Sequence, residues 1–103
     1  MATFKGISAE DAKQRMREEK IQMADIRDEQ SFNTEHVEGA FHLCNANISR
    51  FMQDVDFDTP IFVICYSGHG SKGVAQYLCD QGYTQTYSVN GGFGAWKIAG
   101  LND

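Results

Sequence analysis

The longest apolar run of the chain is Ile61–Tyr66, which contains only β-branched, aromatic and sulfur-containing residues. A short unbroken run of this kind is typical of a strand that is buried on both faces of a parallel sheet. Pro60 precedes it, at a position where a strand tolerates proline. The amphipathic segment Ser71–Gln81 follows, and Gly82 after it is a favourable residue for ending a helix. The pattern predicts a central strand, a short loop and a helix.

Along the rest of the chain, segments with the hydrophobic pattern of a strand alternate with segments that have the pattern of a helix. We predict further strands at Phe4–Ile7, Ile21–Ile26, Ala40–Leu43 and Tyr83–Val89, and helices from Ser8 to about Glu19, from Asp28 through Phe32, and over Ile48–Met52 and Phe93–Ala99. Asp54–Thr59 is predicted to be a polar connection and Asn90–Gly92 a turn. Alternating strands and helices predict an α/β fold with a mostly parallel central sheet flanked by helices on both faces.

Composition and charge narrow the class of protein. The 103 residues are enough for one domain, over 1–103, and the 42% hydrophobic and 22% charged residues are ordinary for a compact chain. The apolar run is too short to span a bilayer, and Met1–Ile7 shows no signal-peptide pattern, so we expect a cytoplasmic protein with no membrane partner. A formal net charge of −5 argues against nucleic acid as a partner.

The cysteines supply the candidate chemistry. Cys44, Cys65 and Cys79 are an odd number, and their spacing fits neither a CxxC motif nor a zinc site, so we expect no disulfide framework and no metal. Cys65 ends the central strand and faces the start of a helix, whose N–H groups and partial positive charge favour a thiolate. A buried structural cysteine is the alternative there. Cys79, beside Leu78, is expected in the core, and nothing around Cys44 lowers its pKa.

The residues after Cys65 form the predicted substrate-binding loop. They are Tyr66, Ser67, Gly68, His69, Gly70 and Ser71, followed by Lys72. Backbone N–H groups of such a loop can surround an anionic sulfur, and its glycines allow a tight turn. His69 and Lys72 are the candidates for attracting an anion, although a lysine at that position can equally point into solvent.

Four motifs then resemble a known family in order and spacing. They are Asp25-Ile26-Arg27 followed by Phe32, the segment His36–Leu43, Cys65 with Gly68, and the segment Gly91–Trp96. Together they resemble the rhodanese domain. The short length and the phrase Asp56–Pro60 further resemble the single-domain thiosulfate sulfurtransferases of bacterial glycerol-metabolism operons.

The resemblance implies an enzyme that works by double displacement without a cofactor. The Cys65 thiolate would attack the outer sulfur of thiosulfate, release sulfite and hold the sulfur as a persulfide. Cyanide, a thiol, or a small dithiol protein such as thioredoxin would then accept it. Many family members carry arginine or lysine in the loop, whereas this sequence leaves His69 and Lys72 for that purpose. Asp25, Arg27, His36 and His42 are expected to be structural, and Trp96 is expected to pack on the sheet.

Two other functions stay open from the residues alone. Cysteine phosphatases and arsenate reductases use a related loop with an arginine six residues after the cysteine, where this chain has Ser71. Without that planar donor, charge on a phosphoryl group would be poorly matched. A sulfur-relay or binding module without catalysis is the other alternative.

Overall fold

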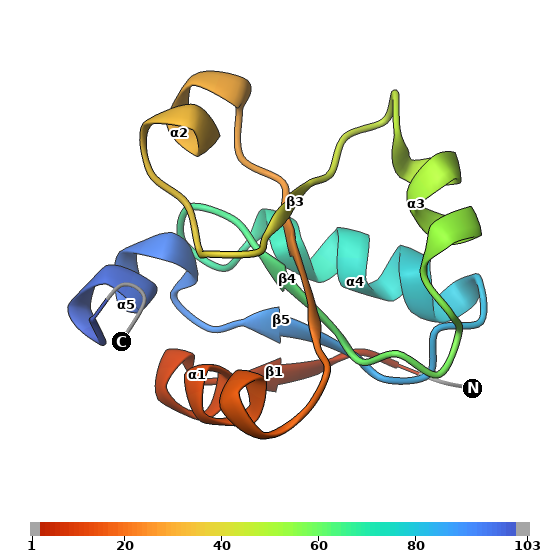
Figure 1. Cartoon of the computed structure of the whole chain (residues 1–103), viewed down its shortest axis with the longest axis horizontal. Helices are drawn as coiled ribbons and strands as arrows, with labels where there is room; N and C mark the ends of the chain where they lie inside the picture. Colours follow the sequence, from red (N-terminus) through yellow and green to blue (C-terminus); the bar gives the residue numbers. More distant parts are fainter. Residues whose placement is uncertain (1–2, 101–103) are drawn as a thin grey trace.

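The computed structural model describes residues 3–100, so the outermost residues of the predicted 1–103 domain and the start of the Met1–Ile7 segment lie outside the described part. Five strands form one sheet in the order β1-β5-β4-β2-β3, and each neighbouring pair is parallel (Figure 1). The strands are β1 (Lys5–Ile7), β2 (Gln22–Asp25), β3 (Phe41–His42), β4 (Ile61–Ile64) and β5 (Thr86–Val89). No helix within residues 3–100 is long and apolar enough to cross a membrane.

Within residues 3–100, five helices surround this sheet. They are α1 (Ala9–Glu18), α2 (Glu29–Thr34), α3 (Ile48–Asp54), α4 (Gly70–Asp80) and α5 (Gly92–Ile98). Buried residues of α1 and α5 share one core cluster, and those of α3 and α4 share another. The short α2 lies beyond the carboxyl ends of the central strands (Figure 1). The predicted α/β fold with helices on both faces is confirmed, and the sheet is parallel throughout its described strands.

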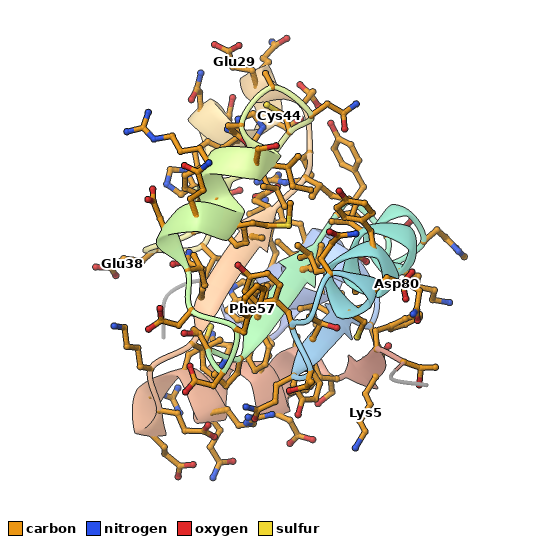
Figure 2. All side chains as sticks on the ribbon, turned by 90° about the vertical axis from the view of Figure 1, so that its right-hand side faces the viewer. Lys5, Glu29, Glu38, Cys44, Phe57 and Asp80 are labelled. Atoms are coloured by element: carbon orange, nitrogen blue, oxygen red, sulfur yellow. The ribbon has the colours of Figure 1, made fainter. Side chains whose placement is uncertain are left out.

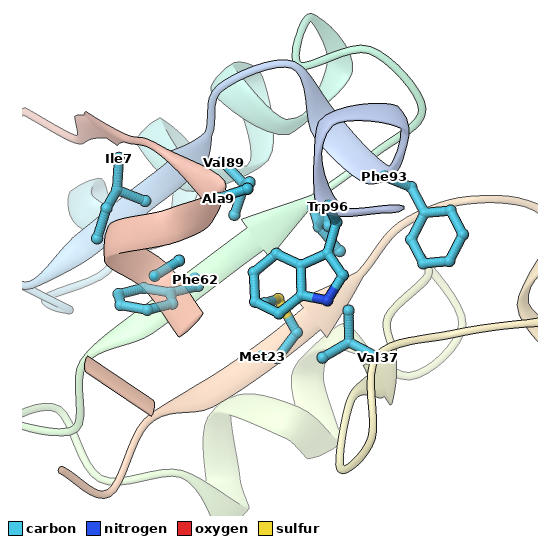
Figure 3. Packing of buried hydrophobic residues seen from close by; sticks show 10 residues of the cluster. Ile7, Ala9, Met23, Val37, Phe62, Val89, Phe93 and Trp96 are labelled. Carbon is cyan, nitrogen blue, oxygen red and sulfur yellow. The ribbon is translucent and has the colours of Figure 1, made fainter. Parts of the chain in front are cut away.

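The central strand β4 divides the core into two halves. Its four residues are fully buried, and they alternate between the two clusters because successive side chains of a strand point to opposite faces. Phe62 and Ile64 pack with Met23, Val89 and the α5 residue Trp96 on one side (Figure 3). Ile61 and Val63 pack on the other side against Phe51, Ala75 and Leu78. The unbroken apolar run of the sequence therefore reflects burial on both faces.

The ends of three helices follow the expected local chemistry. Ser8 caps α1 by accepting a hydrogen bond from the Asp11 amide at 3.1 Å, and Asp28 caps α2 by accepting one from the Ser31 amide at 3.1 Å. Gly82 follows α4 with a φ of +114°, and its amide bonds back into the last helical turn. These three predictions from local sequence are confirmed.

The predicted strand Tyr83–Val89 is wrong in its first three residues, because β5 begins only at Thr86. Tyr83 still belongs to the helix ending, and its amide donates to the Leu78 carbonyl at 3.1 Å. Its ring is fully buried, and its hydroxyl donates to the carbonyl oxygens of Met52 and Val55. An aromatic residue at this position thus joins two helices on the α3 and α4 face instead of extending the sheet.

The other predicted elements differ from the structure by one or two residues at their ends. The largest consequence is that β4 stops at Ile64, so Cys65 and Tyr66 stand outside the strand. Helix α4 begins at Gly70, one residue earlier than predicted, while α3 continues to Asp54 and α2 to Thr34. Cys65 is therefore part of a loop of irregular backbone, here called the cysteine loop, that spans residues 65–69.

Candidate active site

Cys65 is the first residue after β4, the central strand, whose four residues are all fully buried. Its neighbours across the sheet end at the same edge, because all strands run in one direction. The residue is 6% exposed, so its sulfur is largely withdrawn from water yet close to the surface. The carboxyl edge of a parallel sheet is the usual location of a ligand site in α/β folds.

Two backbone amides and one hydroxyl group converge on the sulfur atom of Cys65. The amides of Gly68 and Ser71 donate to Sγ from 3.1 and 3.3 Å, and the Cys65 thiol donates to the Ser71 hydroxyl oxygen at 3.3 Å. A thiolate has no proton, so in that form the bond reverses and the Ser71 hydroxyl donates to the sulfur. Burial raises the pKa of the Cys65 thiol, but bonds from Ser71 and the amides of Gly68 and Ser67 outweigh it, leaving the pKa below its usual value. Within residues 3–100 the bonds to the sulfur come from backbone amides and a hydroxyl, and no cationic side chain is among them.

A second serine supports this arrangement from the neighbouring strand. The Ser88 hydroxyl on β5 lies 2.6 Å from the Ser71 hydroxyl, and both residues are buried. With Ser88 donating to Ser71, the Ser71 proton is directed toward the sulfur, and such chains strengthen each other in a low dielectric. Ser88 was not among the site residues predicted from the sequence. Its only signal there was a polar position two residues after Thr86 on the strand beside β4, where it is in register with Val63.

The first turn of α5, which is rich in glycine, holds the cysteine loop from the other side. The amides of Phe93 and Gly94 donate to the carbonyl oxygens of Cys65 and Tyr66 at 2.7 and 3.3 Å. A Cβ on Gly92, whose φ is +59°, would lie 2.5 Å from the Cys65 carbonyl oxygen. The start of α5 therefore positions Cys65, and this contact was not visible in the sequence.

The predicted binding residues fall into a buried group and an exposed group. Gly68 and Ser71 are buried beside the sulfur, whereas the side chains of Tyr66, Ser67, His69 and Lys72, and Gly70 itself, lie at the exposed surface around it. Tyr66 is 55% exposed, and its hydroxyl lies 2.9 Å from the Ser31 hydroxyl on α2. Lys72 lies in the first turn of α4, as predicted. Binding of an anion by His69 and Lys72 stays a prediction.

A family model for the rhodanese-like domain matches residues 8–99. The chain belongs to the rhodanese-like domain family. Among solved structures, a rhodanese-like domain protein from Staphylococcus aureus has 23% identity and a TM-score of 0.81, over 96% of this chain and 97% of that one. A protein from Staphylococcus saprophyticus has 22% identity and a TM-score of 0.80, over 97% and 100% of the two chains.

A thiosulfate sulfurtransferase from Pseudomonas aeruginosa is also similar in fold, with a TM-score of 0.85 and 15% identity. It covers 97% of this chain, while this chain covers only 19% of that much longer protein. At such low identity the likeness shows the rhodanese-like fold alone. The predicted family resemblance and fold class are confirmed by these matches.

In this rhodanese-like domain, the Asp25 and Arg27 pair joins the sheet to α2 and α5. The Arg27 guanidinium donates to both Asp25 carboxylate oxygens and, at 2.7 Å, to the Glu35 carbonyl oxygen. It also lies 3.8 Å from the centre of the Phe93 ring. Both charged side chains are almost completely buried, at 4% and 0% exposure. The contacts are those of a structural tie beside the site.

The two histidines of the second motif are engaged with Phe32. The His36 and His42 rings stack on the Phe32 ring at centroid distances of 3.9 and 4.6 Å. Ring nitrogens of His36 and His42 lie 2.7 and 2.6 Å from the carbonyl oxygens of Phe32 and Arg27. These contacts fit the structural turn predicted for both residues.

The remaining cysteines and the tryptophan are outside the cradle around the Cys65 sulfur. Cys79 is buried beside Thr86, as predicted for a core residue, and Cys44 is exposed at the rim of a pocket of about 500 Å³ (Figure 2). Trp96 is 2% exposed and packs on the sheet beside Val37 and Met23 (Figure 3). Within residues 3–100 no cluster of three metal-ligating side chains occurs.

Proposed function

We propose that this rhodanese-like domain is a thiosulfate sulfurtransferase that carries sulfane sulfur as a persulfide on Cys65. The observation that carries the proposal is the convergence of the Gly68 amide, the Ser71 amide and the Ser71 hydroxyl on one buried sulfur. These donors favour the thiolate, which is the nucleophilic form of cysteine. Exposed Cys44 and buried Cys79 have no comparable set of donors among the described bonds.

The reaction divides into two displacements at sulfur. In the first, the Cys65 thiolate attacks the outer sulfur of thiosulfate, the sulfur–sulfur bond of thiosulfate breaks, and sulfite leaves with the bonding electrons. In the second, cyanide or a thiolate attacks the outer sulfur of the persulfide, and Cys65 leaves as a thiolate. A small dithiol protein such as thioredoxin is a further candidate acceptor, and a reducing compartment such as the cytoplasm would keep the thiol available.

The cradle suits both steps because the negative charge stays at the same place. Donors that stabilise the thiolate also stabilise it as the leaving group of the second displacement. They are held in advance by α4, β5 and the first turn of α5, so little rearrangement is needed when charge develops. His69 and Lys72, exposed at the start of α4, would attract the dianion toward the loop.

Phosphatase or arsenate reductase chemistry is less well supported. Six residues after the cysteine, Ser71 directs a hydroxyl at the sulfur and offers no charged, planar donor to a phosphoryl group. The cysteine loop itself contains no arginine or lysine. We therefore expect turnover of an aryl phosphate to be far below sulfur transfer from thiosulfate.

Intact mass spectrometry after incubation with thiosulfate tests the proposal directly. The protein should gain the mass of one sulfur atom, and a reducing thiol should remove it. Cys65→Ser should abolish the gain, whereas Cys44→Ser, at an exposed cysteine outside the cradle, should retain it. Sulfur uptake by Cys65→Ser at the wild-type rate, or an adduct mapped to Cys44 or Cys79, would contradict the mechanism.

A further inference from the structure

The hydrogen bonds around the Cys65 sulfur are of two kinds, fixed and reversible. The backbone amides of Gly68 and Ser71 lie 3.1 and 3.3 Å from the sulfur, and an amide N–H can only donate. The Ser71 hydroxyl, at 3.3 Å, can donate or accept, because its proton rotates about the C–O bond. The direction of the hydroxyl bond therefore depends on the state of the sulfur.

The direction that sulfur transfer requires is from Ser71 to Cys65. Only the resting thiol carries a proton on this sulfur, and it donates that proton to the Ser71 hydroxyl oxygen. The attacking thiolate, the inner sulfur of the persulfide and the departing thiolate carry none, so they can only accept. The Ser71 hydroxyl must therefore point its proton at the sulfur during both displacements.

Ser88 on β5 is placed to set this direction. Its hydroxyl oxygen lies 2.6 Å from that of Ser71, and the residues are 1% and 0% exposed, so bulk water does not compete for the bond. When Ser88 donates to the Ser71 oxygen, the Ser71 proton is left for the sulfur. The Ser71 hydroxyl also becomes a stronger donor, because bonds in a chain polarise one another.

We propose that Ser88 is a positioning residue for sulfur transfer, which turns the Ser71 hydroxyl toward the Cys65 sulfur in every state in which that sulfur carries no proton. The kinetic part of this proposal rests on the proposed function. When the thiol loses its proton, the two hydroxyl bonds reverse together: Ser71 stops donating to Ser88 and accepts from it instead. No atom or electron is added to either displacement.

The same strand offers a matched control. Thr86 lies two residues before Ser88, is 2% exposed, and also faces α4. Its hydroxyl donates to the Ala75 carbonyl oxygen at 3.1 Å and lies 2.6 Å from the Cys79 sulfur. Thr86→Val therefore removes a buried hydroxyl from the same contact between α4 and β5 while leaving the chain of bonds to Cys65 intact.

Loss of the Ser88 hydroxyl should raise the pKa of Cys65. For Ser88→Ala we expect about half a unit, or roughly a three-fold loss of thiolate below the pKa, because Ser71 still donates but is less strongly polarised. Thr86→Val should leave the pKa unchanged. Alkylation by iodoacetamide across a pH series, in a Cys44→Ser background and read by intact mass, measures it. A thermal melt checks that both variants are folded at the assay temperature.

The two half-reactions should respond differently in Ser88→Ala. Below the pKa, sulfur uptake from thiosulfate should slow about two-fold, because the smaller thiolate fraction is partly offset by a more nucleophilic thiolate. Above the pKa of both proteins, uptake should equal or slightly exceed that of the wild type. Discharge of the persulfide to cyanide should slow about two-fold at every pH, because Cys65 leaves as a less stabilised thiolate. A merely structural serine would not produce this pattern.

A double-mutant cycle decides whether Ser88 acts through Ser71. In a Ser71→Ala background, Ser88→Ala should not move the alkylation midpoint any further. The proposal is overturned by an unchanged midpoint in Ser88→Ala alone, by a shift that persists without the Ser71 hydroxyl, by an equal shift in Thr86→Val, or by discharge to cyanide at the wild-type rate.

These outcomes are separate from failure of the proposed function. Alkylation reports the ionisation of Cys65 without any transfer of sulfur. A wild-type protein that takes up no sulfur from thiosulfate would overturn the sulfurtransferase, while the alkylation midpoints would still decide whether Ser88 orients the Ser71 hydroxyl.

Discussion

Removing the Ser71 hydroxyl should raise the pKa of Cys65 and slow sulfur uptake at neutral pH. In Ser71→Ala the amides of Ser71 and Gly68 stay at 3.3 and 3.1 Å from the sulfur, and only the hydroxyl at 3.3 Å is lost. A hydrogen bond to a charged acceptor is worth about 1.5–3 kcal/mol, and two other donors remain, so we take the lower value. Since one pKa unit corresponds to about 1.4 kcal/mol, the pKa should rise by about one unit.

The kinetic consequence follows from the fraction of thiolate. At a pH below both pKa values, one unit reduces the thiolate about ten-fold, and the rate of the first displacement should fall nearly as much. At a pH above both values the two proteins should react at similar rates. The variant also strands the Ser88 hydroxyl, which lies 2.6 Å from Ser71, so a small loss of stability accompanies the kinetic effect.

The lowered pKa of Cys65 also makes the stability of the protein depend on pH. The folded thiol of Cys65 has a pKa below its usual 9.0, so the thiolate contributes stability above the pKa of the unfolded thiol and loses it as the pH falls through the folded value. Ser71→Ala should bring the folded pKa of Cys65 closer to the unfolded one. The pH range between the two values then narrows, and the thiolate contributes less to stability. Urea unfolding at several pH values measures it.

Alkylation by iodoacetamide across a pH series, read by intact mass, measures the pKa. Cys44→Ser as the background removes the exposed thiol, and Ser49→Ala, an exposed serine on α3, is the matched control. We expect the midpoint to move upward in Ser71→Ala and to stay in place in Ser49→Ala. An unchanged midpoint in Ser71→Ala would refute the assignment of the hydroxyl as a donor to the thiolate.

Three further predictions concern the surroundings of the site. Gly92→Ala places a Cβ about 2.5 Å from a backbone oxygen of the cysteine loop, so it should lower the free energy of unfolding and sulfur uptake, whereas Gly73→Ala, with open space on α4, should stabilise by about 0.5–1 kcal/mol. Urea unfolding compares the two, and a destabilised Gly73→Ala or a neutral Gly92→Ala would contradict this reasoning. Lys72→Ala should raise KM for thiosulfate several-fold at low salt, which corresponds to about 1 kcal/mol, and this effect should shrink as salt is added. The Tm of the variant should be equal to or slightly above that of the wild type. An unchanged KM at low salt would show that Lys72 does not belong to the site. Asp25→Asn leaves the buried Arg27 charge unpaired and should lower the free energy of unfolding by about 3–5 kcal/mol in urea, and a loss below about 1 kcal/mol would show that the pair is dispensable.

Much of the fold was predictable because local chemistry and burial agree. The Ile61–Tyr66 run predicted a strand covered on both faces, and all four residues of β4 are fully buried. Ser8 and Asp28 predicted helix starts, since a short polar side chain satisfies amides that a helix leaves free. Tyr83 was misassigned because strand propensity alone does not show that its ring fills a gap between α3 and α4.

For the site, the sequence by itself determined the elements that surround Cys65, the predicted nucleophile: it lies after an apolar strand and before a helix, and its loop supplies the amides. The tertiary structure alone decided which groups from distant segments reach that loop. Ser88 is seventeen residues from Ser71, and its hydroxyl meets that of Ser71 because α4 packs against β5. Likewise α5 binds the Cys65 carbonyl, and Lys97 meets Glu35 across sixty-two residues of chain, at 3.0 Å. Such contacts depend on strand order and helix packing, which local residue patterns do not encode.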